Sequence, residues 1–570
     1  MKIRLSTTNE VIEVYENETL YQILKRVHKN DYFKYLGAKV NNKLKGLCSR
    51  NFKENDEIDF IDITNPDGHR IYVRTLSLIY VKACKEVYND IDVSINHSLN
   101  KGLYTELQYK HLVTKKHLNA IKDKMQEIID AKKTITTYFL SVDKATEVFS
   151  AQGMMDKVEV LKYWNKDSIR VYELDGYFDT FYGYVAPNTG FVNKFDLRLF
   201  YPGIILNYPT RESNYELPEY IEQKKLSKVF KEAEDWGEIM DVAYVGALNK
   251  KIVNNLINDM IRVNEALHEK KIVNNSISDM IRVNEALHEK KIAYIADEIT
   301  GDKNIKIVLI AGPSSSGKTT FAQRLSIQLR VNGKKTYAIS LDDYFVDRHL
   351  TPKDENGELD FESIKALDLE LFNEQLIDLM AGEEVQIPVY NFKEGSREYS
   401  REPVRLTSDH IIIIEGIHGL NDELTENIPK INKFKIYISA LTQLNIDRHN
   451  RISTSDLRLL RRITRDYTHR GNNAVKTMEL WDNVIKGAEK YIFPYQENAD
   501  AIFNSALVYE LGVLKKYAEP IIMEIDEDSS FYSERQRLLK FLSYFLPIED
   551  ESAIPNTSIL REFIGESCFR

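Results

Sequence analysis

Hydrophobic and polar residues alternate at the start of the chain in a pattern that predicts a small sheet domain. Period-two or apolar-rich segments flank one amphipathic helical stretch, and they are Lys2–Ser6, Val11–Tyr15, Ala38–Leu47 and Ile58–Ile63, with the helix at Thr19–Val27. Strands alternate with period two, whereas helices place apolar residues three or four apart. Two strands, a helix and two more strands predict a β-grasp domain over residues 1–68.

Residues 69–230 mix helical and strand patterns, which predicts an α+β accessory domain. Within it, Leu112–Lys133 has the spacing of a charged amphipathic helix, and Tyr177–Asn188 is typical of a hairpin or loop. His97 is the one residue there with candidate chemistry. A lone histidine is more often a hydrogen-bonded structural residue than a ligand, so we predict a structural role.

A tandem duplication lies in the helical stretch that follows, residues 231–300. Lys250–Glu269 recurs as Lys270–Glu289, and the two positions that differ are serine in the second copy, Ser276 and Ser278. Two copies are too few for a solenoid, which needs about three. In one continuous helix 20 residues advance by about 2000°, about 200° beyond five turns, which would turn the second apolar stripe away from the first. We therefore predict a break near His268–Lys271 or a projecting copy, and interpret the duplication as a tolerated insertion.

The segment Lys306–Thr320 carries the strongest chemical signal in the chain. A β-branched run, Ile307–Ala311, is followed by a glycine loop and then by a helix-compatible segment, Phe321–Arg330. This order is typical of a phosphate-binding loop, although a chance match in a Ser/Gly turn is the competing interpretation. We expect the loop amides, the lysine and the threonine hydroxyl to bind phosphates and Mg²⁺. The predicted nucleotide-binding residues are Gly312, Ser314, Ser315, Ser316, Gly317, Lys318, Thr319 and Thr320.

Two further apolar runs end in carboxylates, at the edge where substrates bind in parallel α/β sheets. Tyr337–Leu341 leads into Asp342 and Asp343, and Ile411–Ile414 leads into Glu415. Because adjacent strand residues point to opposite faces, only one of the two aspartates is expected to face the phosphates. Glu415 has the position of a Walker-B carboxylate on the Mg²⁺ side of the nucleotide, although an ordinary core strand would also explain the run before it.

A basic helical stretch, Arg458–Gly471, follows these strands. Between residues 447 and 470 seven arginines stand against three aspartates, on a chain whose net charge is −10. Arg462 and Arg465 are three residues apart and share one helical face. Guanidinium groups match phosphate oxygens, which favours an arginine lid over the transferred phosphate. A solvated basic face or an RNA-binding one is the alternative.

The motifs between residues 306 and 510 together resemble the uridine kinase and phosphoribulokinase family. The matching stretches read SLDDYF, IPVYNFKEGSR, IIIIEGIHGL and RRITRDYTHRG. The resemblance implies a P-loop α/β kinase with a parallel sheet that uses ATP and Mg²⁺, and it implies that Asp342 is the base for the attacking hydroxyl. The other implied catalytic residues are Lys318, Arg462 and Arg465, and the implied metal ligands are Thr319 and Glu415. The implied substrate-binding residues are Asp343, Tyr344, Glu362, Tyr390, Phe392 and Arg470.

Three positions depart from the pattern of that family. Uridine kinases read the pyrimidine edge with a histidine where this chain has Gly395 and with a glutamine where it has Leu480, and they usually have aspartate where it has Glu362. A site without such hydrogen-bonding groups loses the strongest means of rejecting analogues. We therefore predict a small, nucleoside-like hydroxyl acceptor whose identity is open.

The front of the chain resembles threonyl-tRNA synthetases. NETLYQIL, ENDEIDFID and DGHRIYVRT resemble the TGS domain, and residues 69–230 resemble the second accessory domain. In that family two residue pairs form an editing site, and here the corresponding positions hold Thr75, Ile79, Phe181 and Val185. None of these side chains binds a metal or works as an acid or base, so the resemblance implies an inherited fold without the editing chemistry. A generic ubiquitin-like adaptor is the alternative for residues 1–68.

Length and composition set the remaining expectations. A chain of 570 residues with 29% charged residues predicts about three or four soluble domains. We divide it into the two front domains, a helical connector over 231–300, a kinase domain over 301–510 and a helical extension over 511–570, with Arg561 near the site. The net charge argues against general polyanion binding. Three scattered cysteines argue against a disulfide framework, and the lack of a long apolar run or signal-peptide core predicts a cytoplasmic protein without membrane contact.

Three functions fit these observations. The first is a kinase that transfers the γ-phosphoryl group of ATP to a hydroxyl of a nucleoside or a related small molecule. The second is an RNA- or ribosome-associated ATP-binding regulator that uses the TGS-like front, which the acidic charge disfavours. The third is a kinase of sugar phosphates, for which we find no surplus arginine or lysine beyond the lid. The oligomeric state is open.

Overall fold

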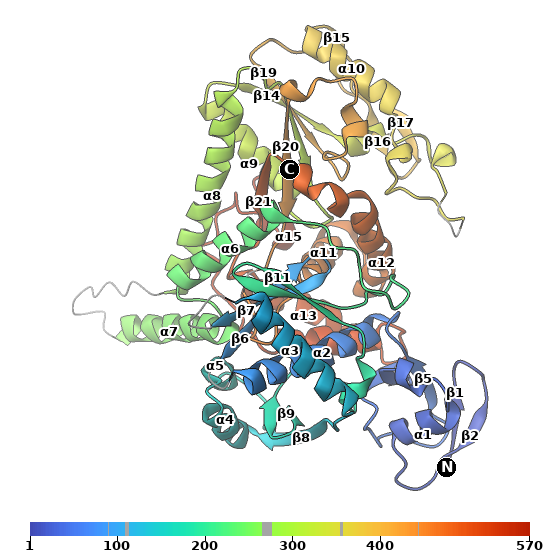
Figure 1. The fold of residues 1–570 in the computed structure, drawn as a ribbon. Helices are drawn as coiled ribbons and strands as arrows, with labels where there is room; N and C mark the ends of the chain where they lie inside the picture. The colour runs from blue at the N-terminus through green and yellow to red at the C-terminus, as the bar shows by residue number, and fades with distance from the viewer. Residues whose placement is uncertain (89–90, 109–112, 265–275, 354–356, 443, 570) are drawn as a thin grey trace.

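The structure of the chain, a computed structural model, has the N-terminal sheet and the sheet of the second half at opposite ends of the molecule (Figure 1). It describes residues 1–88, 91–108, 113–264, 276–353, 357–442 and 444–569, without the side chains of residues 255–264. No helix in this described part is both long and apolar enough to span a membrane.

The N-terminal unit is a five-stranded mixed sheet with one helix. Its elements are β1 (Lys2–Leu5), β2 (Val11–Glu13), α1 (Leu20–Val27), β3 (Gly37–Val40), β4 (Lys43–Lys45) and β5 (Glu57–Ile61), and the strand order is β2-β1-β5-β3-β4. The alternation predicted from the sequence buries Ile3 and Leu5 on one face of β1. Helix α1 begins where the Thr19 side chain accepts a hydrogen bond from the Gln22 amide, which is a capping box. The β-grasp assignment stays a prediction.

The second unit is built around a long buried helix, α2 (Pro66–Val87). Strands β6 (Asp92–Leu99), β7 (Gly102–Gln108), β11 (Asp196–Phe200) and β12 (Gly203–Asn207) form an antiparallel sheet, and β8 (Thr136–Ser141), β9 (Ser168–Leu174) and β10 (Tyr177–Asp179) form a second. Helix α3 (Lys115–Asp130) lies between β7 and β8 in sequence, and helices α4 (Val142–Ala151) and α5 (Met155–Leu161) lie between β8 and β9. Helix α3 confirms the amphipathic helix predicted there.

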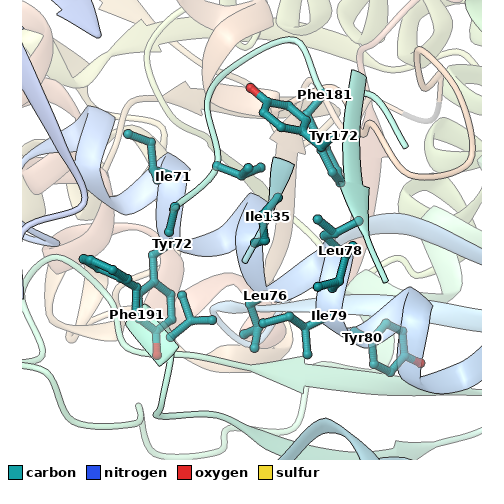
Figure 2. Close-up of a cluster of buried hydrophobic side chains, with 14 of the residues drawn as sticks. Ile71, Tyr72, Leu76, Leu78, Ile79, Tyr80, Ile135, Tyr172, Phe181 and Phe191 are labelled. Atoms are coloured by element: carbon teal, nitrogen blue, oxygen red, sulfur yellow. The ribbon is translucent and has the colours of Figure 1, made fainter. Parts of the chain in front are cut away.

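The four positions aligned with the synthetase editing site lie inside the core of this unit. Ile79 and Phe181 belong to the hydrophobic cluster shown in Figure 2, and Val185 is also buried. Thr75 is fully buried, and its hydroxyl donates to the Ile71 carbonyl and accepts from the Ala186 amide. These side chains fill space and complete backbone hydrogen bonds.

His97 has the structural role predicted for it. Its ring stacks on Phe230, with centroids 3.9 Å apart, and its Nδ1 lies 3.2 Å from the Glu234 carboxylate. Burial lowers the pKa of this imidazole, so the ring is held mainly as a neutral packing group.

The connector consists of helices α6 (Lys224–Ile239), α7 (Val245–Asn264) and α8 (Ile277–Gly301). The described residues of the first copy, 250–264, belong to α7, and those of the second copy, 276–289, form the cap and the start of α8. The predicted break at His268–Lys271 lies outside the described residues. Ser276, one of the two changed positions, caps α8 by accepting a hydrogen bond from the Asp279 amide at 3.2 Å, so this serine has a structural use.

The second half is a parallel five-stranded sheet covered on both faces. Its strands are β13 (Ile307–Ala311), β14 (Lys335–Ser340), β19 (His410–Glu415), β20 (Lys433–Ser439) and β21 (Ala501–Asn504), in the order β14-β19-β13-β20-β21. Helices α8 and α9 (Lys318–Val331) pack on one face, and α10 (Leu369–Ala381) packs on the other. Between α10 and β19 lie two short hairpin pairs, β15 (Glu384–Val385) with β18 (Val404–Arg405) and β16 (Val389–Asn391) with β17 (Ser396–Glu398).

Five more helices complete the second half, and the last of them returns to the sheet. They are α11 (Thr454–Arg470), α12 (Ala474–Tyr491), α13 (Glu510–Met523), α14 (Tyr532–Leu542) and α15 (Arg561–Ile564). Helices α11, α13 and α14 share one hydrophobic cluster, and α15 adds Phe563 to the cluster under α9. The C-terminal extension is therefore part of the core of this half.

A buried polar network joins the second unit, called the accessory unit from here on, to the second half of the chain. The Lys157 ammonium lies 2.7 Å from an Asp447 oxygen and 2.9 Å from an Asp179 oxygen, and His449 Nδ1 lies 2.7 Å from the other Asp179 oxygen. Burial alone would raise the pKa of Asp179, but the Lys157 ammonium and the hydrogen bond with His449 hold it well below its ordinary value. Because an unpaired buried charge is costly, this arrangement fixes how the two units dock.

Candidate active site

The phosphate-binding loop has the backbone geometry that its glycines predict. A Cβ at Gly312 would lie 2.0 Å from the Ile438 carbonyl oxygen, so only glycine fits between β13 and β20. Gly317 has φ +86° and starts α9 from the left-handed region, where glycine is strongly preferred. Ser315 also has a positive φ, of 61°. The loop therefore turns from β13 into the N-terminus of α9, where the helix dipole favours an anion.

Polar atoms in this loop fit a triphosphate. The Ser315 and Ser316 hydroxyls are buried and have no hydrogen-bond partner within the described residues. Buried polar groups are nearly always satisfied, so two orphans in one anion-facing loop point to a ligand. The Lys318 ammonium donates to the Gly312 carbonyl at 2.9 Å and is half-buried at the mouth of the loop.

Glu415 and Thr319 provide oxygen ligands that suit Mg²⁺. Glu415 ends β19 directly beside β13, since the register pairs it with Ile310. The Thr319 hydroxyl donates to a Glu415 carboxylate oxygen at 3.2 Å. Burial raises the pKa of Glu415, and the Lys318 ammonium acts against that rise. Mg²⁺ commonly takes one or two protein oxygens together with substrate phosphates, which is the donor set present here.

Asp342 lies next to this pair, on a turn rather than on a strand. Strand β14 ends at Ser340, which is in register with Glu415, and Asp342 follows in a 3-10 turn over Leu341–Tyr344. The predicted strand end at Leu341 was thus one residue too long. The Asp342 carboxylate is exposed to solvent, while the surrounding protein atoms raise its pKa and the Lys318 ammonium opposes this rise. A carboxylate with a raised pKa is a stronger base.

Asp343 and Tyr344 of the same motif point elsewhere. The Asp343 carboxylate pairs with the Arg401 guanidinium at 2.9 Å and accepts the Tyr390 amide at 3.4 Å. Its position supports the prediction that only one of the two aspartates faces the phosphates. Tyr344 is 1% exposed, and its hydroxyl donates to Gln375 at 2.8 Å. Its place in the core excludes Tyr344 from the predicted substrate-binding set.

Glu362 lies near Lys318 and Arg462, and the two predicted aromatic residues lie close to each other. The half-buried Glu362 carboxylate interacts electrostatically with Lys318 and Arg462, and burial raises its pKa. Tyr390 lies on β16 with its ring 5.1 Å from that of Phe392, which is 58% exposed. Phe345 packs against both rings. The predicted pair of aromatics is therefore brought together.

An arginine that the sequence did not single out occupies the place where a base-reading histidine was expected. Arg348 donates from its backbone amide to the Gly395 carbonyl at 2.8 Å and from its guanidinium to the Phe392 carbonyl. A Cβ at Gly395 would lie 2.8 Å from Arg348 Nε, so glycine admits this side chain. Leu480, the other departure, lies on α12 and is 37% exposed.

The predicted lid arginines converge on one buried carboxylate. Arg462, Arg465 and Arg470 approach Asp466, which is fully buried, at 3.2, 2.9 and 3.6 Å. Arg462 also donates to the Ser314 hydroxyl at 3.0 Å, which joins the helix to the phosphate loop. Helix α11 ends at Gly471 with φ +67°, which confirms the predicted terminator. In the sequence, Asp466 stood out only as one of the three aspartates set against seven arginines.

Two other arginines of α11 hold the loop backbone from behind. Arg458 Nε donates to the Ser314 carbonyl at 2.9 Å, and Arg461 Nη1 donates to the Ser315 carbonyl at 3.3 Å. Both guanidinium groups are almost fully buried. They fix the loop through its backbone carbonyls.

The C-terminal extension touches the phosphate loop through Ile559 and Glu562, two residues that the sequence did not single out. A Cβ at Gly317 would lie 2.5 Å from Ile559, and the Thr320 hydroxyl donates to a Glu562 carboxylate oxygen at 2.7 Å. Glu562 also interacts electrostatically with Lys318. Arg561, expected near the site, instead pairs with Glu551 at 3.1 Å. No local pattern marks Glu562, because its partner lies 242 residues away in sequence.

The fold and this site define a P-loop kinase class: a parallel sheet, a glycine loop at a helix N-terminus, and carboxylates at the ends of the two neighbouring strands. Residues 307–510 match the Phosphoribulokinase / Uridine kinase family. A uridine kinase of Brevibacillus brevis is 31% identical over 201 residues, which cover 35% of this chain and 84% of the relative. The chain belongs to the Phosphoribulokinase / Uridine kinase family through this region, which is an ATP-dependent phosphotransferase domain with a hydroxyl acceptor.

Two further comparisons each cover about a third of the chain. A uridine kinase of Schizosaccharomyces pombe is 32% identical over 186 residues, but these are only 37% of its own length and 32% of this chain. A solved structure of a possible uridine kinase from Bacillus stearothermophilus aligns with 20% identity and a TM-score of 0.27, covering 38% of this chain and 98% of that one. The similarity reported by these comparisons lies in the second half.

Proposed function

We propose that the chain transfers the γ-phosphoryl group of ATP to a hydroxyl group of a nucleoside-like acceptor. The observation that carries the proposal is the position of three groups: Lys318 in the phosphate loop, Glu415 beside it and Asp342 on the turn after the next strand. Uridine kinases among the relatives favour a nucleoside over other alcohols.

Each group has a distinct task in this mechanism. The loop amides and Lys318 hold the β- and γ-phosphates, and Arg462 and Arg465 neutralise the charge that develops on the transferred group. Asp342 accepts a hydrogen bond from the attacking hydroxyl, orients it and takes its proton as the new P–O bond forms. Thr319 and Glu415 would hold Mg²⁺, which would supply positive charge next to the phosphates.

Other groups, distinct from those that bind the phosphates, hold the acceptor. We assign Glu362 to the sugar hydroxyls and Tyr390 with Phe392 to the faces of the base. Arg348 takes the position of a base-reading side chain, and an arginine donates hydrogen bonds but accepts none. The chemistry therefore favours an acceptor that presents carbonyl or other acceptor oxygens at this edge.

The experiment that tests this function is ADP release with a panel of acceptors. Purified chain, Mg²⁺ and ATP are incubated with uridine, cytidine, purine nucleosides, sugar phosphates and RNA, and products are weighed by mass spectrometry. We expect ADP release that requires a nucleoside and yields its monophosphate. ADP release stimulated only by RNA would instead support a regulator that uses the TGS-like front domain, and stimulation only by sugar phosphates would overturn the nucleoside assignment.

A further inference from the structure

Three cationic side chains without acidic partners lie where the accessory unit meets the C-terminal extension. Arg74 on α2 is 9% exposed, and Arg170 on β9 and Lys540 on α14 are half-buried. Lys540 interacts electrostatically with both arginines. Within the described part of the chain none of the three forms an ion pair with a carboxylate, and Arg170 Nε lacks any hydrogen-bond partner.

Two other arginines near this interface do have carboxylate partners. Arg70 pairs with Glu534 at 3.1 Å, and Arg537 pairs with Asp456 at 2.8 Å. Buried charges normally have such partners, because an uncompensated one costs several kcal/mol. Three cations without a carboxylate partner, beside arginines that have one, therefore point to an anionic ligand.

A glycine and two tyrosines accommodate the two arginines of this cluster. A Cβ at Gly183 would lie 2.0 Å from Arg74 Nη1, so only glycine admits that guanidinium. The Arg74 guanidinium stacks on the Tyr182 ring at 4.7 Å, and that of Arg170 stacks on the Tyr184 ring at 4.0 Å. Stacking holds each planar group in place, and the Nε of Arg170 has no hydrogen-bond partner within the described residues.

The charge of Lys540 is disfavoured by burial and by the neighbouring cations. Burial, followed by the nearby Arg170, Arg74 and Lys166 charges, lowers the pKa of its ammonium group to about 7. An anion bound beside Lys540 would relieve this repulsion on its ammonium group. Tyr182 and Tyr184 are half-buried, so the cluster is reachable from solvent.

We propose that Arg74, Arg170 and Lys540 bind the phosphate group of a small anionic ligand at the junction of the accessory unit and the C-terminal extension. A phosphate monoester or pyrophosphate carries about two or more negative charges and presents several acceptor oxygens, which matches two guanidinium forks and an ammonium group. A carboxylate carries one charge and would leave the cluster strongly positive. This site is separate from the phosphate loop and does not depend on the proposed acceptor.

The test uses full-length chain carrying Lys318→Ala, which weakens phosphate binding at the P-loop. Pyrophosphate, inorganic phosphate and, at matched ionic strength, acetate and chloride are titrated while thermal unfolding and binding heat are recorded. Lys540→Met and Arg170→Gln are added separately to this background. Arg198→Gln is the matched control, because Arg198 stacks on Tyr220 at 3.8 Å in the same unit but lies outside the cluster.

Two results together support the site. Pyrophosphate and phosphate raise the unfolding temperature and acetate and chloride do not, and Lys540→Met and Arg170→Gln each weaken pyrophosphate binding by at least about tenfold, while Arg198→Gln does not. Without anion, Lys540→Met unfolds at a higher temperature than its parent, because a repelled ammonium group is removed. A merely structural lysine would give the opposite shift. Phosphate stabilisation that is absent, or that survives both cluster substitutions, overturns the proposal.

Discussion

The phosphate loop and the core of the accessory unit differ in the kind of side chains that they bury. Around the loop, Lys318, Thr319 and Asp342 remain polar and accessible, and two hydroxyls are buried without partners. In the accessory core, Ile79 and Phe181 fill a hydrophobic cluster (Figure 2). Unsatisfied polar groups mark a place kept for a ligand, whereas close-packed apolar groups mark a place that contributes to stability.

The largest expected effect concerns Lys318. Lys318→Ala should lower kcat/KM for ATP by about 10³-fold, because a preorganised cation next to the transferred phosphate is lost. Lys335→Ala is the control, since this exposed lysine lies at the other end of β14 and pairs only with Asp409 in the described structure. Steady-state ADP release measures both variants. Equal losses in the two variants would remove the contrast on which the site assignment rests.

A substitution in the accessory core should lower stability and leave the catalytic rate unchanged. Ile79→Ala should reduce the free energy of unfolding by about 2–5 kcal/mol, because it opens a cavity at a fully buried position. The kcat of the protein that remains folded should stay unchanged. Chemical denaturation and activity at low temperature provide the two readings, with Ile221→Ala, 64% exposed in the native chain, as control. A large fall in kcat without a fall in stability would give the accessory core a chemical role.

Asp466 is predicted to act through the lid arginines. Asp466→Asn removes the shared partner of Arg462, Arg465 and Arg470, so their guanidinium groups repel one another and lose their fixed positions. We expect kcat to fall by about tenfold with a smaller change in the KM for the acceptor. Asp466→Glu should recover part of the rate. A purely structural role would lower stability in both variants without the split between kcat and KM.

The contact from the C-terminal extension predicts a smaller change. Glu562→Gln removes a negative charge beside the N-terminus of α9 while keeping a hydrogen-bond acceptor for Thr320. The KM for ATP should therefore fall by about two- to fivefold, since like-charge repulsion against the triphosphate is relieved. Glu566→Gln, at an 80% exposed side chain, serves as the control. A rise in the KM for ATP would show that Glu562 supports the nucleotide instead.

The duplication should matter least. Deleting residues 256–275 joins Asn255 to Ser276 and keeps the second copy, which supplies the contacts of Asn284 and Glu285 with Val508 and Tyr509. We expect an unchanged unfolding midpoint and unchanged kcat, which circular dichroism and ADP release would measure. A loss of either would contradict the interpretation as a tolerated insertion.

The local parts of this architecture could be predicted from the sequence. Strand β13 and the start of α9 follow from a β-branched run and a glycine loop, whose patterns are confined to a few residues. Glu415 was predicted from the strand it ends, and its hydrogen bond to Thr319 agrees with the metal-side position expected for it.

The parts that could not be predicted depend on residues far apart in sequence. Glu562 meets Thr320 through the path of the extension, and Arg348 covers Gly395 because a hairpin folds back on it. Asp466 was visible but unremarkable, since burial among three arginines has no signature in a helical pattern. Tyr344 was assigned to the substrate by its motif, and its burial in the core removed it.

The measurement that tests the central claim most directly follows the γ-phosphoryl group itself. ATP labelled with ¹⁸O in the γ-phosphoryl group is incubated with Mg²⁺, a nucleoside and either the native chain or Asp342→Asn. We predict that the label appears in the nucleoside monophosphate with the native chain and that Asp342→Asn lowers this transfer by at least about 10²-fold while ATP still binds. Label found only in inorganic phosphate, or transfer unaffected by Asp342→Asn, would contradict the account.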